Sequence, residues 1–185
     1  RQAVALEPEY AEAHYNLGVT LRELGNLEEA EINLKRALDL KPGYSEAHSE
    51  LGIMLHRQRR LEEAAVSFRQ AISLQSDDAS AHYNLGATLQ KLGNWEEAEA
   101  SLRQAIALEP SNAEAHNNLG NILSVQGKLH KAIEHFTSAL SINPLFPQAH
   151  NNLANALMQQ SKISEAEKYY RKAVEINPNY SEALN

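Results

Sequence analysis

The sequence predicts an all-α protein built as a stack of helical hairpins. Three observations support this fold class: a 34-residue period through nearly all of the 185 residues, apolar residues at helical spacing within each period, and helix-ending glycines and prolines at fixed places. Since a short hairpin cannot bury its apolar face alone, we expect neighbouring units to stack into one continuous core.

The first helix of each unit carries a histidine followed three residues later by Leu-Gly. In the first unit, Ala13, Leu17, Leu21 and Leu24 follow a spacing of three or four residues, which predicts one apolar stripe on a helix. The histidines that open the motif are His14, His48, His82, His116 and His150, and in the last unit Ala154 replaces the glycine.

The second helix carries two small positions with a large residue between them. The small positions are Ala30, Ala64, Ala98, Ala132 and Ala166, then Ala37, Ala71, Ala105, Ala139 and Ala173; the large residues are Leu34, Phe68, Leu102, Phe136 and Tyr170. We expect the large residues and Trp95 to lie in the core. We also expect Gly18 and its equivalents to face Ala30 and its equivalents, so that the backbones approach closely.

Glycines separate the two helices of most units. Gly25, Gly93 and Gly127 stand where a helix ends in a left-handed residue, which needs no Cβ. Arg59 and Ser161 occupy the same place, and we expect the same conformation there at a cost of about 1 kcal/mol each. Prolines, which cannot continue a helix, close the units at Pro8, Pro42, Pro110, Pro144 and Pro178.

These residues resemble the tetratricopeptide repeat family, whose unit has 34 residues with small, large and proline positions at these offsets. The resemblance implies a right-handed α-solenoid with a concave groove lined mainly by first helices. As a single array, the chain divides into the end of a preceding repeat at 1–10, full repeats at 11–44, 45–78, 79–112, 113–146 and 147–180, and the start of another at 181–185.

The chain opens at Arg1 and stops at Asn185 in mid-pattern, so we expect it to be a piece of a longer protein. Natural arrays finish with a polar capping helix, and neither end supplies one. End-to-end self-association through apolar terminal repeats is therefore a further expectation.

Composition argues against several classes of function. The net charge of −7 disfavours nucleic acid, the absence of cysteine excludes thiolate sites, and no apolar run is long enough for a membrane span. The repeated histidines lie too far apart to converge on one metal, and no catalytic or cofactor motif is present. We therefore expect no enzyme activity, catalytic residue, cofactor or metal, and a cytoplasmic location.

The resemblance implies that the groove is lined by positions two, five, six, nine, twelve and thirteen of each first helix. Asparagine recurs there, similar to the asparagine ladder of O-linked N-acetylglucosamine transferases, and amides can pair with the backbone of an extended peptide. The candidate residues are Asn16, Asn84, Asn118, Asn121, Asn152 and Asn155, with Tyr15 and Tyr83 as side contacts. The alternative interpretation is that asparagine is an ordinary polar choice on a solvated surface.

The predicted function is a protein-interaction scaffold that binds an extended or helical peptide in this groove. Chaperone-tail binding is disfavoured, because the fifth position carries Tyr15, Ser49, Tyr83, Asn117 and Asn151 where that class needs lysine. Three further functions are compatible with the same repeats: an architectural spacer, a substrate-delivery arm beside a glycosyltransferase-like domain, and a self-stacking module.

Overall fold

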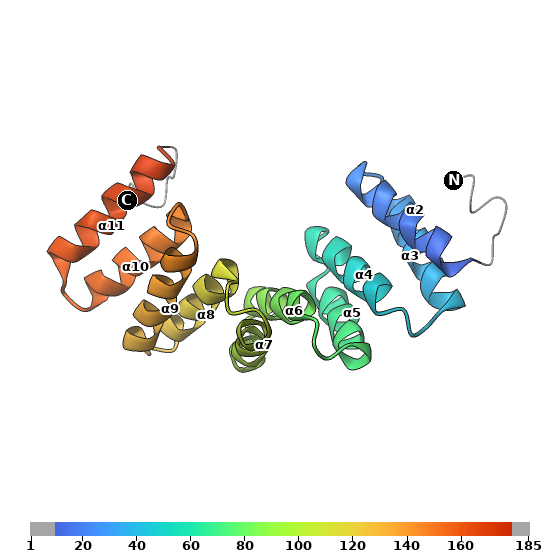
Figure 1. The fold of residues 1–185 in the computed structure, drawn as a ribbon, viewed down its shortest axis with the longest axis horizontal. Coiled ribbons are helices and arrows are strands. Elements are labelled where there is room, and N and C mark those ends of the chain that lie inside the picture. Colours follow the sequence, from blue (N-terminus) through green and yellow to red (C-terminus); the bar gives the residue numbers. More distant parts are fainter. Residues whose placement is uncertain (1–9, 179–185) are drawn as a thin grey trace. The chain divides into compact units, whose positions relative to one another are not determined.

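A computed structural model describes residues 10–178, which contain ten α-helices and, within that range, no strand (Figure 1). The chain separates into two compact units, Arg1–Asn94 and Trp95–Asn185. Unit 1 holds α2 (Ala11–Glu23), α3 (Leu27–Leu40), α4 (Ser45–Arg57), α5 (Leu61–Leu74) and α6 (Ala79–Leu92). Unit 2 holds α7 (Trp95–Leu108), α8 (Ala113–Val125), α9 (Leu129–Ile142), α10 (Pro147–Gln159) and α11 (Ile163–Ile176).

Each unit is built from helical hairpins that stack on their neighbours. In unit 1, α2 packs on α3 and α4 on α5, while α3 contacts α4, α5 contacts α6, and the first helices α2, α4 and α6 contact one another in sequence. Unit 2 repeats the scheme with α8–α9 and α10–α11 as hairpins, and α8 contacts α10. The all-α fold class of stacked helix-turn-helix units is confirmed.

The alanine positions of the second helices form the centre of the core. All ten are completely buried, and the large residues Leu34, Phe68, Leu102 and Phe136 are at most 1% exposed. Tyr170 is only half-buried, contrary to expectation, because no helix among the described residues follows α11 and covers it.

Two other core predictions are wrong. Trp95 is half-buried, since it occupies the first position of α7. Leu24 is 70% exposed, because α2 ends at Glu23 and the following residue leaves the apolar stripe.

The helical glycines make room for the large residue of the hairpin. A Cβ at Gly18 would lie 2.8 Å from the Leu34 side chain, and a Cβ at Gly120 would lie 2.5 Å from the Phe136 ring. The expected partner, Ala30, contributes a backbone oxygen at 3.3 Å from the Gly18 position. The close approach is therefore chiefly between a helix backbone and a large side chain, which corrects the prediction.

The turns between paired helices have the predicted left-handed residue. Gly25, Gly93 and Gly127 have φ of 81°, 78° and 74°, and Arg59 and Ser161 adopt φ of 65° and 62°. The prediction for the two non-glycine residues is confirmed, because the 34-residue spacing fixes the turn more strongly than the residue type does.

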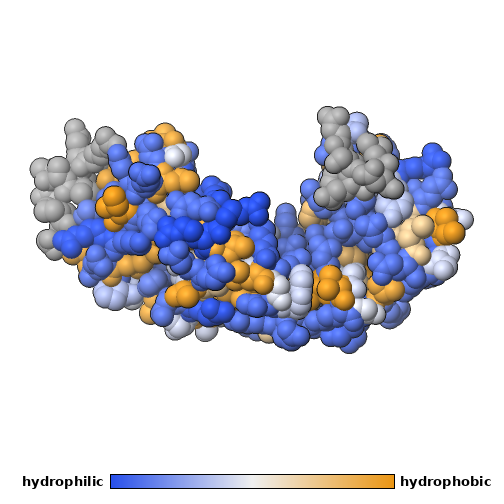
Figure 2. Space-filling model, turned by 180° about the vertical axis from the view of Figure 1, so that it is seen from behind, coloured by the Kyte–Doolittle hydropathy of each residue, from blue (hydrophilic) through white to orange (hydrophobic). Residues whose placement is uncertain are grey.

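The surface of the described part is mostly hydrophilic, with apolar residues singly or in small groups on the face shown in Figure 2. None of the described helices is both long enough and apolar enough to cross a bilayer. The predicted partial repeats at 1–10 and 181–185 lie almost entirely outside the described residues, and the repeat boundaries stay a prediction.

Candidate functional site

A depression of about 280 Å³ lies over Phe136 in unit 2, between α8 and α10. It brings together three of the predicted amides with two further polar side chains. Its lining consists of Asn121, Ser124, Val125, Phe136, Asn152, Asn155, Ala156 and Gln159. The buried Phe136 ring supplies an apolar surface, and amide and hydroxyl groups surround it.

The repeat geometry explains why these residues meet. α8 and α10 are neighbouring first helices, and residues three or four apart on one helix share a face. Asn152 and Asn155 therefore stand on one face of α10, while Asn121 and Ser124 stand on the facing side of α8. Gly120 allows the Phe136 ring to lie directly against α8.

Two of the predicted amides are held by the protein itself. The Nδ2 of Asn152 donates to the Oδ1 of Asn117 at 2.9 Å, and the Tyr170 hydroxyl donates to the Oδ1 of Asn155 at 2.5 Å. These bonds leave the Oδ1 of Asn152 and the Nδ2 of Asn155 as the groups that could meet a ligand. The half-buried Asn152 and the exposed Asn155 are thus each oriented by one hydrogen bond.

The other candidates are arranged as follows. The side chains of Asn84, Asn118 and Asn121 are half-buried and that of Asn16 is exposed, and none of these four amides makes a hydrogen bond within residues 10–178. Asn16 and Asn84 belong to unit 1 and do not line the unit 2 depression.

The two candidate tyrosines are half-buried. The ring of Tyr15 lies against that of Tyr44, with centroids 4.9 Å apart at 40°. Burial, followed by the charges of Glu50 and Glu46, raises the pKa of Tyr15. One face of Tyr15 is therefore already occupied by the chain.

Sequence reasoning missed three residues of this site. Phe136 was assigned only to the core, and neither Asn117 nor Tyr170 was recognised as a support for an amide. The bond between Asn117 and Asn152 could have been found from the sequence. The two residues lie 35 positions apart, one repeat plus one residue, which places them at adjacent positions on neighbouring first helices.

The equivalent place in unit 1 carries different chemistry. The positions 68 residues earlier than Ser124, Ala156 and Gln159 are His56, Thr88 and Lys91. The Nδ1 of His56 lies 2.8 Å from the Thr88 hydroxyl oxygen, and its Nε2 lies 3.0 Å from the Lys91 ammonium nitrogen. Burial lowers the pKa of His56, and the charges of Lys91 and Arg59 lower it further.

Four of the repeated histidines bond to the loop that precedes their own first helix. The Nε2 groups of His48, His82, His116 and His150 lie 2.9–3.2 Å from the carbonyl oxygen of the residue six positions earlier, to which they donate. His14 and His150 are buried and the other three are half-buried, so the prediction that they pack between helices is only partly met. Among residues 10–178, no cluster of three or more His, Asp or Glu could hold a metal ion.

One histidine has another histidine as its partner. The Nδ1 atoms of His116 and His135 lie 3.1 Å apart. Burial lowers the pKa of both rings, and the neighbouring imidazole and Arg103 lower that of His135 further. Both rings are therefore neutral near pH 7, with one Nδ1 donating to the other.

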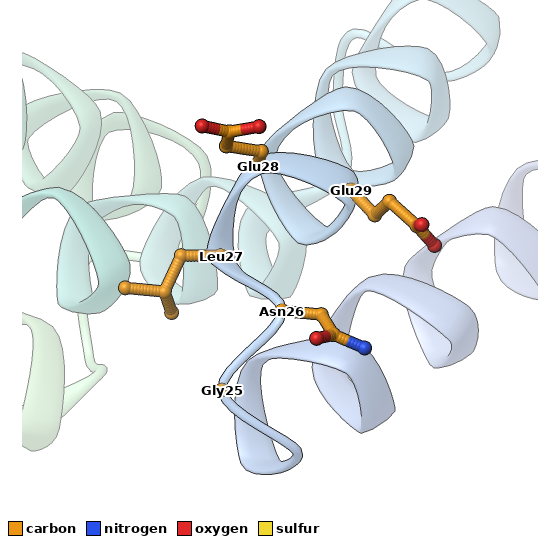
Figure 3. A pocket seen from close by; sticks show the side chains of 5 residues that line it. All are labelled: Gly25, Asn26, Leu27, Glu28 and Glu29. Atoms are coloured by element: carbon orange, nitrogen blue, oxygen red, sulfur yellow. The ribbon is translucent and has the colours of Figure 1, made fainter.

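The turn between α2 and α3 contains a second depression, of about 400 Å³, lined by Gly25, Asn26, Leu27, Glu28 and Glu29. Figure 3 shows that the side chains of Asn26, Glu28 and Glu29 point in different directions rather than toward one another. Their polar groups do not converge on a common ligand, so this turn is a poorer candidate than the depression over Phe136.

Comparison with known families decides the classification. A tetratricopeptide-repeat model described as the C-terminal domain of cilia and flagella-associated protein 70 matches residues 1–144, and the tetratricopeptide repeat model itself matches residues 147–180. The chain belongs to the tetratricopeptide repeat family. Folds of this family typically serve as protein-interaction scaffolds. No curated protein matches this tetratricopeptide repeat chain in sequence.

Solved structures of other tetratricopeptide repeat proteins share the fold. YrrB, described as a TPR protein with an unusual peptide-binding site, superposes with a TM-score of 0.84 at 24% identity, over 99% of this chain and 94% of its own. MamA gives 0.83 at 27% identity, covering 92% and 93%. PilF of Pseudomonas aeruginosa gives 0.83 at 26% identity, covering 94% and 79%.

Proposed function

We propose that this tetratricopeptide repeat chain is an interaction scaffold that holds an extended peptide segment along its first helices through asparagine amides. The observation that carries the proposal is the depression over Phe136, where Asn121, Asn152 and Asn155 lie together around an apolar floor. Pre-oriented amides reduce the entropy lost when a ligand is bound.

The chemistry of the site suits a peptide backbone. A backbone offers one N–H donor and one C=O acceptor per residue, and an asparagine amide can satisfy either group. Because such contacts ignore side-chain identity, the amides would supply affinity, and the apolar floor would accept one ligand side chain. An affinity in the micromolar range, about −8 kcal/mol, is expected for a polar, open groove of this kind.

Asn16, Asn84 and Asn118 extend this proposal beyond the depression. Each occupies the sixth position of a first helix and has an amide that makes no hydrogen bond within the described residues. Tyr15 and Tyr83 are proposed as side contacts, with Tyr15 limited to the ring face that Tyr44 leaves open. YrrB, of the same fold, has a peptide-binding site, which supports this class of ligand.

The test is a peptide-array screen of the chain beside a variant with Asn84→Ala, Asn118→Ala and Asn121→Ala. These three amides make no hydrogen bond within residues 10–178, so each change should alter the free energy of unfolding by less than about 0.5 kcal/mol. Asn152 is avoided because its removal would leave the buried Asn117 oxygen unpaired. The proposal predicts that peptides bound by the chain are lost by the variant.

A matched control carries Asn26→Ala and Asn94→Ala, which remove exposed amides from the turns between helices. Its binding should equal that of the unaltered chain, with an unchanged helical circular dichroism spectrum for all three proteins. Equal binding by the groove variant, or no peptide bound by any protein, would contradict the proposal.

A second candidate function is self-association through α11. Within residues 10–178, the Oδ1 of the buried Asn151 has no hydrogen-bond partner, whereas the equivalent Asn117 is satisfied by the next first helix. A depression of about 440 Å³ on α11 is lined by Tyr170, Arg171, Val174 and Glu175. We propose a first helix of a second copy as the occupant; Val174→Glu should then abolish any dimer seen by sedimentation, and a concentration-independent monomer would reject it.

A further inference from the structure

The same repeat positions form an uncharged pocket in unit 2 and a cationic pair in unit 1. In unit 2, Ser124 and Gln159 line the depression between α8 and α10. Their unit 1 equivalents are His56 on α4 and Lys91 on α6, whose nitrogen atoms lie 3.0 Å apart. The floor is equivalent as well, since Phe68 takes the place of Phe136 and is equally buried.

A short hydrogen-bond chain fixes the His56 ring. The Thr88 hydroxyl donates to the backbone oxygen of Asn84 at 2.6 Å, so its oxygen must accept the Nδ1–H of His56. Thr88 is completely buried, which holds the chain in place. The Nε2 of His56 is then an acceptor, and it receives one of the three N–H groups of Lys91.

The cations around this pair have no acidic partner. Arg57, Arg59 and Lys91 form no ion pair with any carboxylate in the described part of the chain. Several other cations are paired; Arg60, for example, contacts Glu31 at 2.7 Å and Glu63 at 2.6 Å. The ends of α4 and α6 therefore carry positive charge that no carboxylate among residues 10–178 pairs with.

The acidic groove residues of α4 do not neutralise this charge. Glu46 stands ten residues before His56, which corresponds to about 15 Å along the helix axis. Glu50 stands six residues before His56, about 9 Å along the axis, and is already paired with Arg22 at 3.0 Å. Charges in solvent are largely screened beyond roughly 8 Å at physiological ionic strength. The local field at His56 and Lys91 is therefore positive, although the chain as a whole carries −7.

We propose that His56 and Lys91 select an anionic side chain of the bound peptide, a carboxylate or a phosphate, at the unit 1 position equivalent to the uncharged pocket of unit 2. The inference rests on the proposed peptide-binding function and adds a side-chain preference to it. Lys91 would direct a free N–H to the anion, and Arg57 and Arg59 would add long-range attraction. The Nε2 of His56 can donate a second hydrogen bond to the anion only when it carries a proton, and charged donors of this kind give the selectivity that a backbone-binding amide cannot.

A bound anion would also raise the pKa of His56, because its negative charge offsets the repulsion between the protonated imidazole and the Lys91 ammonium. The groups facing the ring are Thr88 and Lys91 of α6 and Arg59 of the α4–α5 turn. None of them is acidic, so the ligand would supply the compensating charge. Affinity for acidic peptides should accordingly rise as the pH falls from about 7.5 to 6, where histidine begins to titrate.

The experiment is an NMR titration with three capped pentapeptides, Ala-Ala-X-Ala-Ala, in which X is Asp, Asn or phosphoserine. The ring resonances of His56 and the side-chain amides of Asn84, Asn121 and Asn155 are followed. The Asp peptide should bind about fivefold more tightly than the Asn peptide and shift the His56 ring, the range expected for a partly exposed charge contact. A phosphoserine peptide that binds tenfold or more beyond the Asp peptide would identify phosphate as the preferred anion.

Residue exchange between the units provides the matched variants. His56→Ser with Lys91→Gln gives unit 1 the residues of unit 2 and should remove the Asp preference, whereas Lys131→Gln, which removes an exposed lysine from α9, should retain it. Ser124→His with Ala156→Thr and Gln159→Lys, which also supplies the equivalent of Thr88, should create a second Asp preference in unit 2.

The outcomes separate the two proposals. If the asparagine amides respond but Asp and Asn peptides bind alike, the selectivity for anions is wrong and the peptide-binding function stands. If no peptide perturbs any asparagine amide, the proposed function fails and this inference fails with it.

Discussion

Unit 1 and unit 2 place the same repeat positions around the same kind of buried ring, yet they present different groups to solvent. Over Phe136 the neighbouring first helices offer amides and a serine, and at the equivalent positions of unit 1 they offer a histidine hydrogen-bonded to a lysine. The difference shows that the 34-residue framework fixes where a side chain stands, while the residue placed there decides what the surface can recognise.

The supports of the amides differ between the units as well. Asn152 donates to Asn117 on the preceding first helix, but for the equivalent Asn84 the position of Asn117 is taken by Ser49, which has no amide oxygen. The Ser49 hydroxyl is buried and has no hydrogen-bond partner in the part of the chain that the structure describes. Equivalent asparagines therefore contribute differently to stability and to binding.

The largest expected effect is a loss of stability, and it tests whether the buried rings of Phe68 and Phe136 are equivalent. Phe68→Ala and Phe136→Ala should each lower the free energy of unfolding by about 3–5 kcal/mol, because each leaves a cavity in place of a ring at most 1% exposed. Urea unfolding followed by circular dichroism measures this. Val66→Ala, at a 55% exposed position of α5, serves as the control with little change expected. A loss of stability in only one of the two alanine variants would show that the two rings are not equivalent.

A smaller effect should distinguish Asn152 from Asn84. Asn152→Ala leaves the Oδ1 of Asn117, which is 5% exposed, without its donor, at a cost of about 1–3 kcal/mol. Asn84→Ala removes an amide with no hydrogen bond among residues 10–178 and should change stability by less than about 0.5 kcal/mol. Equal losses of stability for the two variants in urea unfolding would refute the hydrogen bond from Asn152 to Asn117 as the cause. Replacing Asn117 as well should restore part of the stability lost by Asn152→Ala.

The smallest effect concerns the histidine pair that only unit 2 contains. Since the folded pKa values of His116 and His135 are lowered, the unfolded chain binds protons first as the pH falls below about 6.5. The contribution of the pair to the free energy of unfolding should be constant above that pH and decline below it. For each histidine, the decline should be less than about 1.4 kcal/mol per pH unit.

The variant His135→Tyr, which copies Tyr169 at the equivalent place beside His150, should reduce this decline between pH 7.5 and 5.5. The charged groups facing the pair are Arg103, Glu99 and Glu134. Glu99 does not confuse the measurement, because the hydrogen bond from Arg103 lowers its pKa and its contribution is lost only below about pH 4.3. An unchanged slope in the variant would mean that the pair does not titrate as described.

Much of the fold could be predicted because it depends on spacing. The buried alanines, the hairpins and the left-handed Arg59 and Ser161 all follow from positions repeated every 34 residues. Burial of Tyr170 was predicted wrongly, because its environment depends on the helix that follows rather than on its own position in the repeat.

The site was predictable only in outline. Spacing placed Asn121, Asn152 and Asn155 on facing helices, but the bonds from Asn152 to Asn117 and from Tyr170 to Asn155 depend on side-chain rotamers and on the rotation between hairpins. The contact between His56 and Lys91 joins residues 35 apart, and no single repeat contains both. Sequence periodicity therefore identifies a face, whereas its hydrogen-bond pattern requires the packed structure.

The most direct test of the peptide-binding account follows the side-chain amide resonances of the chain while the strongest peptide from the array is added. The account predicts that the NH₂ signals of Asn118, Asn121 and Asn155 in unit 2 shift with one common dissociation constant and that the signal of Asn84 in unit 1 shifts as well, while those of Asn26 and Asn94 stay in place. Binding that shifts the turn asparagines, or residues of the second helices, and leaves these four amides unchanged would contradict it.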